Sequence, residues 1–176
     1  MAQYRCIRMS LMVLLFGMAI PMAQDNQALT TVSSVDLSRY VGRWHEIAKI
    51  PNRFQKKCVG DTTAEYSLRP DGQIDVLNSC RVADGTIDTA RGVAKIVDRQ
   101  TNARLKVSFV QFLGMRLFWG DYWILGLGDN YEYAVIGTPG RKYGWILSRT
   151  PQMSQENLEK ARQILRQQGY RVESFQ

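Results

Sequence analysis

The side chains in this sequence that could do chemistry do not form a recognisable catalytic arrangement. The chain has one histidine, His45, and no Gly-x-Ser-x-Gly segment, so a serine nucleophile would have to use His45 as its base. Residues 43–50 have the pattern of a β-strand. Alternation along this strand places His45 on the outer face, whereas Glu46 shares the inner face with Trp44. No second acid can be assigned opposite Glu46. We therefore assign no catalytic residue and expect a protein that is not an enzyme.

An inward-facing carboxylate has its own requirements. An ionised carboxylate inside an apolar barrel is costly unless a cation, a donor or ordered water satisfies it. Two roles for Glu46 stay open, namely a structural pair near the floor of the barrel and a hydrogen bond to the polar head of a ligand.

The first residues have the pattern of a secretory signal. Arg5 and Arg8 precede an apolar run of about twelve residues and then small and polar residues, and such a run is short for a membrane span. We predict a signal peptide over residues 1–23, cleaved near Ala23, with an uncleaved anchor as the alternative. Cys6 lies before the apolar run, so no lipobox cysteine follows it. The protein is expected to be exported.

After signal removal two cysteines remain, Cys58 and Cys80. An even count in an exported chain predicts a disulfide. Two cysteines and one histidine cannot complete a four-ligand zinc site without carboxylates, so neither a metal nor a cofactor is expected.

Charge and length indicate one ordinary globular domain. The 176 residues carry a formal net charge of +7, and removal of the two arginines of the signal leaves +5. Lysines and arginines are scattered rather than clustered with aromatics, which argues against nucleic-acid binding. We predict a flexible segment over residues 24–34 and one domain over 35–176.

Eight short β-rich runs separated by turns follow Gly42. They lie in sequential order at about 43–50, 61–68, 73–80, 87–98, 103–110, 121–127, 131–137 and 141–149. Ser154 as N-cap and Gly169 as C′ residue bound one amphipathic helix. We predict an all-β fold: an eight-stranded up-and-down antiparallel barrel with room for a small ligand and one C-terminal α-helix packed outside.

Three short segments of these strands resemble the signature regions of the lipocalins. They contain Gly42 and Trp44, then Asp121 and Tyr122, and finally Arg149. The sequence is most similar to the bacterial Blc type and its apolipoprotein D and plant temperature-induced relatives. The resemblance implies that Trp44 closes the barrel floor with Arg149 across its ring, in structural rather than ligand-binding roles.

Alternation and the resemblance together predict the ligand-binding wall. Its residues are Trp145, Glu46, Ala48, Tyr66, Asn78, Phe109 and Tyr133. At the mouth, the 111–119 loop is unusually apolar and contains Phe112, Leu113, Met115, Leu117, Phe118 and Trp119. Such a loop either contacts a membrane surface or folds inward to cap the cavity.

These observations favour a binding protein. The resemblance implies binding, storage and transport of lipophilic ligands, either fatty acids or lysophospholipids, in the bacterial cell envelope. The expected location is the periplasm, with association with the outer membrane left open. The alternatives are a lipid-acting enzyme and an envelope protein that binds partners or dimerises through its apolar rim, so both a monomer and a homodimer are compatible with the sequence.

Overall fold

The computed structural model describes residues 28–176. The predicted signal peptide and Cys6 lie outside the described residues. The elements are α1 (Leu37–Tyr40), β1 (Gly42–Lys49), η1 (Arg53–Gln55), β2 (Cys58–Leu68), β3 (Ile74–Val82), β4 (Ile87–Ile96), β5 (Arg104–Ser108), β6 (Val110–Phe112), β7 (Met115–Leu117), β8 (Gly120–Leu127), β9 (Tyr133–Gly137), β10 (Gly144–Ser148), α2 (Gln155–Gln167) and η2 (Val172–Ser174), where η marks a 3-10 helix. Within 28–176 no helix is both long enough and apolar enough to cross a bilayer.

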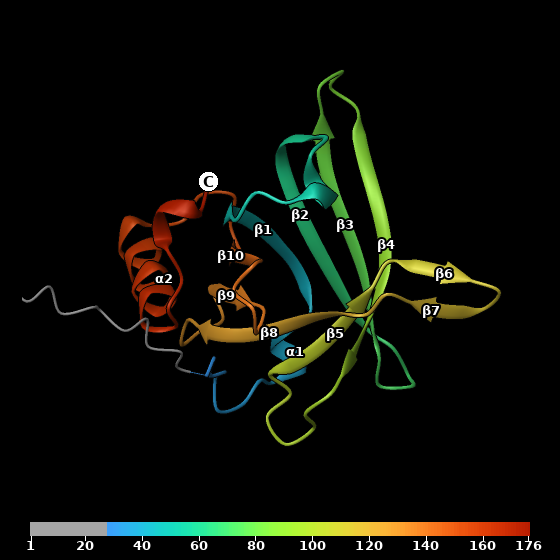
Figure 1. The fold of residues 1–176 in the computed structure, drawn as a ribbon, viewed down its shortest axis with the longest axis horizontal. Helices are drawn as coiled ribbons and strands as arrows, with labels where there is room; N and C mark the ends of the chain where they lie inside the picture. Colours follow the sequence, from blue (N-terminus) through green and yellow to red (C-terminus); the bar gives the residue numbers. More distant parts are fainter. Residues whose placement is uncertain (1–27) are drawn as a thin grey trace, which may run out of the picture.

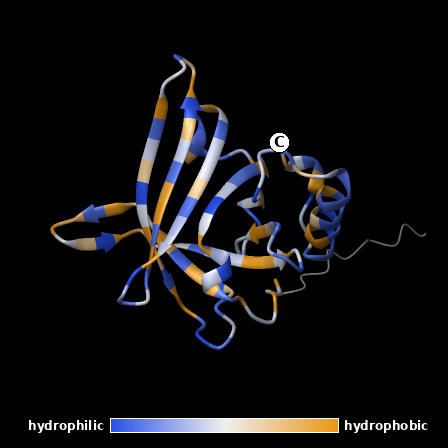
Figure 2. Cartoon of the chain, turned by 180° about the vertical axis from the view of Figure 1, so that it is seen from behind, coloured by the Kyte–Doolittle hydropathy of each residue, from blue (hydrophilic) through white to orange (hydrophobic). Residues whose placement is uncertain are grey.

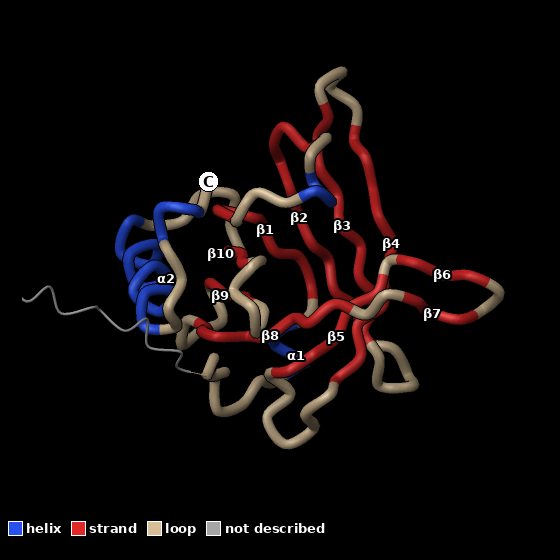
Figure 3. The backbone as a smooth tube through the Cα atoms, viewed as in Figure 1, coloured by secondary structure: helices blue, strands red, loops and turns tan. Residues whose placement is uncertain are grey.

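Eight of the ten strands close into a barrel (Figures 1 and 3). The order around it is β1-β10-β9-β8-β5-β4-β3-β2, and every neighbouring pair is antiparallel. All eight predicted strands are present in the predicted up-and-down order. The fold class is therefore confirmed.

The short helix α1 closes one end of this barrel. Asp36 caps it by accepting hydrogen bonds from the backbone of Ser38 and Arg39. Figure 1 shows α1 at the lower end, where β1 begins. The helix delivers Tyr40, which is 2% exposed, into the inner core.

Two hydrophobic cores share the barrel wall. The inner core fills the lower barrel and includes Trp44, Tyr66, Val76, Leu105, Ile124 and Leu147. The outer core lies between the wall and α2 and includes Leu125, Val135, Ile146, Ala161 and Leu165. In Figure 2 hydrophobic and hydrophilic residues alternate along the long strands, as expected where only one face is covered.

The C-terminal helix α2 has the predicted boundaries. The Ser154 hydroxyl accepts a hydrogen bond from the Asn157 backbone at 3.2 Å. Gly169 follows the helix with a φ of +73°, a conformation that costs glycine little. The buried Ala161 and Leu165 face the barrel, so the helix packs outside it.

Residues 28–34 are the described part of the segment that the sequence predicts to be flexible. Leu29 is 6% exposed and packs in the outer core, and the Val32 amide donates to the Ile124 carbonyl at 3.0 Å. The described part of this segment therefore contacts the barrel through one apolar side chain and one backbone hydrogen bond to β8, and its flexibility stays a prediction.

The apolar loop predicted at the rim forms the hairpin β6–β7. Figures 1 and 2, from opposite sides, show it projecting sideways from the barrel. Leu113 and Phe118 are each 81% exposed, and Phe112 and Met115 are each 60% exposed. The hairpin does not cap the barrel in this conformation, so of the two alternatives left open, the inward cap is not observed.

Candidate ligand-binding site

The floor of the barrel is built on Trp44 and Arg149. The Arg149 guanidinium lies 3.8 Å from the centre of the fully buried Trp44 ring. It also donates to the carbonyls of Arg39, Tyr40, Val41, Arg43 and Tyr131. Burial is the main cause that lowers the pKa of Arg149. These contacts tie α1 to the barrel and close its lower end.

Gly42 lies at the floor, and the second signature pair lies in the wall beside it. Gly42 has a φ of +93°, and a Cβ there would lie 3.4 Å from Arg149 Nη1. Asp121 faces outward and pairs with Lys106 at 3.5 Å, whereas Tyr122 points into the barrel. The signature residues are thus placed at the floor and in the β5–β8 wall.

Above the floor lies a cluster of three tyrosines. Tyr122 Oη is 2.7 Å from Tyr40 Oη and 3.0 Å from Tyr66 Oη. Burial raises the pKa of Tyr66 to about 12 and raises the pKa values of Tyr40 and Tyr122 well above the ordinary value of 10. The cluster is therefore neutral at physiological pH and provides hydroxyls, not charges, at the bottom of the binding wall.

A polar network occupies the wall above the tyrosines. Glu46 Oε1 accepts from Lys49 Nζ at 2.5 Å, and Glu46 Oε2 accepts from Gln55 Nε2 at 2.6 Å. The Trp145 indole N–H donates to Gln55 Oε1 at 3.2 Å. Gln55 comes from η1, which Asn52 caps. The inward carboxylate thus has a cationic partner, as expected on energetic grounds.

The position of Lys49 results from a β-bulge that the sequence does not mark. Glu46 is opposite Leu147, but Ala48 is opposite Ile146 and Lys49 is opposite Trp145. One extra residue in β1 reverses the alternation after Glu46. Lys49 therefore faces inward beside Trp145, although simple alternation places it outside.

The same bulge makes the prediction for Ala48 wrong. Ala48 packs in the outer core, opposite Ile146, rather than on the ligand-facing wall. A shift of one residue moves a strand residue to the other face of the sheet.

The prediction for Tyr133 is also wrong. Tyr133 is opposite Ser148 and packs in the outer core beneath α2. Every residue of β9 is buried, because the inner core covers one face and the helix the other. Burial on both sides removes the hydrophobic alternation from which an inward face could be predicted.

The remaining predicted wall residues face the barrel interior. Tyr66 and Trp145 contact the inner core, and Asn78 shares its face through pairing with Ala64. The Phe109 ring lies against Gly92 on this face, where a Cβ would be 2.8 Å from two ring carbons. Phe109 is 39% exposed, so the upper wall is accessible.

Aromatic rings continue this wall to the mouth. Trp145 stacks with Tyr143 at 6.2 Å between ring centres, and Tyr143 contacts Phe54 at 5.7 Å. Phe54 is 61% exposed on η1. Phe54, Gln55 and Lys49 were not predicted, since loop conformation and the bulge bring them to the wall.

The cysteines of this end form the predicted bond. Cys58 and Cys80 are joined by a disulfide with a Cα–Cα distance of 5.5 Å. The bond joins the first residue of β2 to the upper part of β3. The predicted disulfide is therefore confirmed.

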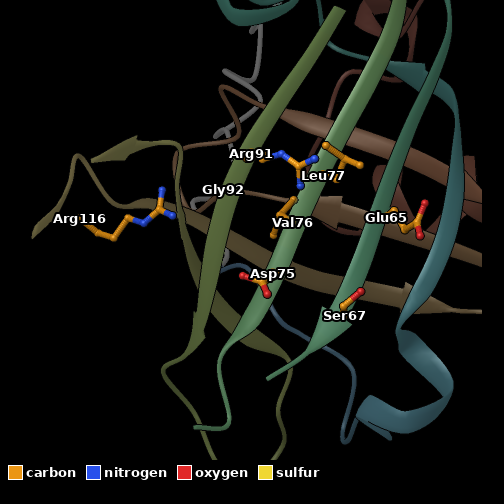
Figure 4. Close-up of a pocket in the computed structure, with 8 residues that line it drawn as sticks. All are labelled: Glu65, Ser67, Asp75, Val76, Leu77, Arg91, Gly92 and Arg116. Atoms are coloured by element: carbon orange, nitrogen blue, oxygen red, sulfur yellow. The ribbon is translucent and has the colours of Figure 1, made fainter. Parts of the chain in front are cut away.

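A separate groove of about 420 Å³ lies outside the barrel. Figure 4 shows Asp75, Leu77 and Arg91 on the outward face of the β3–β4 sheet and Arg116 approaching from the hairpin. Glu65, Ser67, Val76 and Gly92 complete its lining. The groove therefore exists because the hairpin leans toward this outer face.

His45 lies on the outer face of β1, opposite Thr63 and Ser148. It is therefore separated by the wall from Glu46 and Trp145. Among the residues described, no three histidine, cysteine or acidic side chains are grouped as a metal site would require.

Comparisons with known proteins agree with this architecture. Residues 35–176 match the lipocalin-like domain family. The chain is 40% identical to temperature-induced lipocalin-1 of Arabidopsis thaliana over 84% of this chain and 81% of that one, and 36% identical to outer membrane lipoprotein Blc of Escherichia coli K12 over 85% and 81%. It is 35% identical to apolipoprotein D of Macaca fascicularis over 74% and 69%. Among solved structures, insecticyanin of Manduca sexta superposes with a TM-score of 0.68 at 24% identity, covering 85% of this chain and 83% of that one.

A closed eight-stranded antiparallel barrel with one outer helix defines a calyx-type binding protein. The chain belongs to the lipocalin family, whose members bind small hydrophobic ligands.

Proposed function

We propose that this lipocalin binds a single-chain lipid, either a fatty acid or a lysophospholipid, and stores and transports it in the bacterial cell envelope. The observation that carries this proposal is the upper inner wall, where a row of aromatic rings lies beside one polar network. Apolar walls with a few convergent polar groups are typical of small-molecule sites.

The aromatic wall suits the acyl chain. Trp145, Tyr143 and Phe109 offer apolar surface on the inward face. Each methylene removed from water contributes about 0.8 kcal/mol, which corresponds to roughly fourfold in affinity. Affinity is therefore expected to increase with chain length until the chain outgrows the barrel.

The polar network suits an anionic head group. Glu46 accepts from both Lys49 and Gln55, whereas the Lys49 ammonium has three donors and, within the described chain, one acceptor, Glu46. Its other donors can bind a carboxylate or phosphate oxygen beside Trp145. Glu46 then holds Lys49 in position, so of the two roles left open for this carboxylate we propose the structural pair.

Native mass spectrometry with palmitic acid and its neutral counterpart hexadecanol tests the assignment. Lys49→Met is expected to weaken palmitate binding by about ten- to a hundredfold, the range for a hydrogen bond to a charged group, and to leave hexadecanol binding nearly unchanged. Lys160→Met on the outward side of α2 is the matched control. Equal losses for both lipids, or no loss for palmitate, would contradict the head-group role.

We further propose that the hairpin contacts a membrane surface during loading and release. Its exposed apolar side chains accompany Arg116, and the chain is cationic, which suits an anionic bilayer. Phe112→Ser with Leu113→Ser is expected to reduce co-sedimentation with phosphatidylglycerol vesicles. Val97→Ser removes a comparably exposed residue, 55%, from another turn and is expected to leave it unchanged. Equal sedimentation of both variants would contradict this contact.

Export and an envelope location complete the proposal. They are supported by the signal-like pattern of residues 1–23, by the Cys58–Cys80 bond and by the similarity to proteins named outer membrane lipoprotein Blc. The periplasm is the proposed location, with the amino-terminal apolar run rather than a lipidated cysteine as the means of any attachment to the outer membrane. Fractionation of cells that express the full chain, with and without residues 1–23, tests this location.

A further inference from the structure

The hairpin β6–β7 continues the ladder of β5 and β8. In the barrel Val107 is opposite Gly120. Val110, three residues after Val107, is opposite Leu117, three residues before Gly120. The two short sheets therefore have one register, and they form a single long hairpin that is bent at Phe109 on one strand and at Phe118 and Trp119 on the other.

This bend leaves part of β4 without a partner. β4 pairs with β3 from Ile87 to Ala94, but with β5 only from Val93 to Ile96. Among the described strands, none pairs with residues 87–92 on the β5 side. Figure 1 shows the upper half of β4 standing free where β6 turns away. An unpaired strand edge is a template for another strand.

Particular side chains stabilise the bent form. The buried Ser108 hydroxyl lies within hydrogen-bond distance of the Val110 and Leu117 carbonyls, on both strands just beyond the bend. The Phe109 ring lies against Gly92, which is also the residue opposite it when the β4–β5 register continues, so this contact is compatible with both forms. Phe118, however, has a φ of +55°, which is unfavourable for a large side chain, and its ring is 81% exposed.

We propose that residues 110–117 are a hinged flap that alternates between this bent form and a straight form paired with the free edge of β4. In the straight form the β4–β5 register continues, with Arg91 opposite Val110 and Thr89 opposite Phe112. Alternation then leaves Phe109 facing the barrel interior and turns Phe118 toward it. The bent form opens a lateral portal between β4 and β5, and the straight form closes it.

A cysteine pair detects the straight form. In the full chain with Cys6→Ser, Thr89→Cys with Phe112→Cys places two cysteines opposite each other only when the flap is straight. Ala90→Cys with Phe112→Cys is the matched control, because neighbouring residues of β4 point to opposite faces. Under mild oxidation the first pair is expected to form an intramolecular disulfide at least about tenfold faster, since facing Cα atoms lie within disulfide range. Equal rates, or no bond in either protein, would overturn the proposal.

Substitutions at Phe118 provide a second test, in which the two variants are expected to shift the flap in opposite directions. Phe118→Gly relieves the positive φ of the bent form, whereas the β-branched Phe118→Val makes that conformation less favourable. Cross-linking of the first pair is expected to slow with glycine and to accelerate with valine. The same direction for both, or no effect, would contradict a hinge at this residue.

The portal role rests on the proposed function and is tested separately with palmitic acid. Uptake, followed by tryptophan fluorescence, is expected to slow at least about tenfold when the Thr89–Phe112 positions are cross-linked through their cysteines, as chain entry through the gap is then blocked. Unchanged uptake would refute the portal. Failure of the uncross-linked protein to bind palmitate would refute the proposed function, while the cross-linking rates decide the hinge independently.

Discussion

The buried tyrosine cluster predicts a specific loss of stability in alkali. Tyr66 has a pKa raised to about 12 in the folded protein, mainly by burial, and an ordinary value of 10 when unfolded. Between these pH values the unfolded chain has released a proton that the folded chain retains. Stability from Tyr66 is therefore complete below pH 10 and is lost as the pH rises toward 12.

The magnitude follows from the width of this window. A difference of one pKa unit corresponds to about 1.4 kcal/mol, so Tyr66 alone accounts for a loss of about 2.5 kcal/mol between pH 10 and 12. Tyr40 and Tyr122, whose pKa values burial raises well above 10, add to this loss. Tyr66→Phe removes one ionisable group and is expected to flatten the pH dependence by about 2.5 kcal/mol.

Urea unfolding at several pH values, followed by tryptophan fluorescence, measures this loss. In parallel, the ultraviolet absorbance of tyrosinate counts the phenols that ionise in the folded state. At pH 11, of the eight tyrosines in the sequence, those of the cluster are expected to stay protonated until the protein unfolds. Ionisation of all tyrosines near pH 10 with the fold intact would refute the buried cluster. An unchanged pH dependence in Tyr66→Phe would refute its link to stability.

Three further predictions concern the elements that hold the barrel. Arg149→Lys is expected to lower the free energy of unfolding by about 2 kcal/mol, because lysine cannot reproduce the planar guanidinium that donates to several carbonyls above Trp44. An unchanged urea midpoint would contradict this. Replacing both Cys58 and Cys80 by serine should cost about 3 kcal/mol for a 22-residue separation, measured by the same unfolding curves, and a loss below 1 kcal/mol would argue against constraint by the bond. Ser154→Ala should cost about 1 kcal/mol through loss of the N-cap, whereas Ser154→Asp should not, and equal losses would point away from capping.

The sequence predicts those features that rest on local pattern. Turn residues and alternation identify all eight barrel strands, and Ser154 and Gly169 bound the helix correctly. The disulfide is predicted from a count of cysteines in an exported chain. Each of these signals is carried by neighbouring residues, so no knowledge of the tertiary fold is needed.

The predictions that fail concern strand residues whose inward or outward orientation depends on a β-bulge or on burial of both faces of the strand. A bulge between Glu46 and Ala48 places Ala48 outside and Lys49 inside, and no glycine or proline marks it. Tyr133 belongs to a strand buried on both faces, which has no alternation to interpret. Gln55 reaches the wall only through the path of the first loop. Half of the polar network was therefore inaccessible to pattern analysis, whereas Trp145 and Glu46 were predicted to face inward.

The central claim is that a lipid occupies the barrel beside Trp145, and quenching by a brominated fatty acid tests it directly. Trp123 lies in the outer core and serves as the matched control for Trp145. Bound brominated palmitate is expected to quench the fluorescence of the wild type and of Trp123→Phe, and to quench Trp145→Phe much less. Equal quenching of Trp145→Phe and the wild type, with one lipid bound in each, would show that the lipid lies elsewhere and would contradict the account.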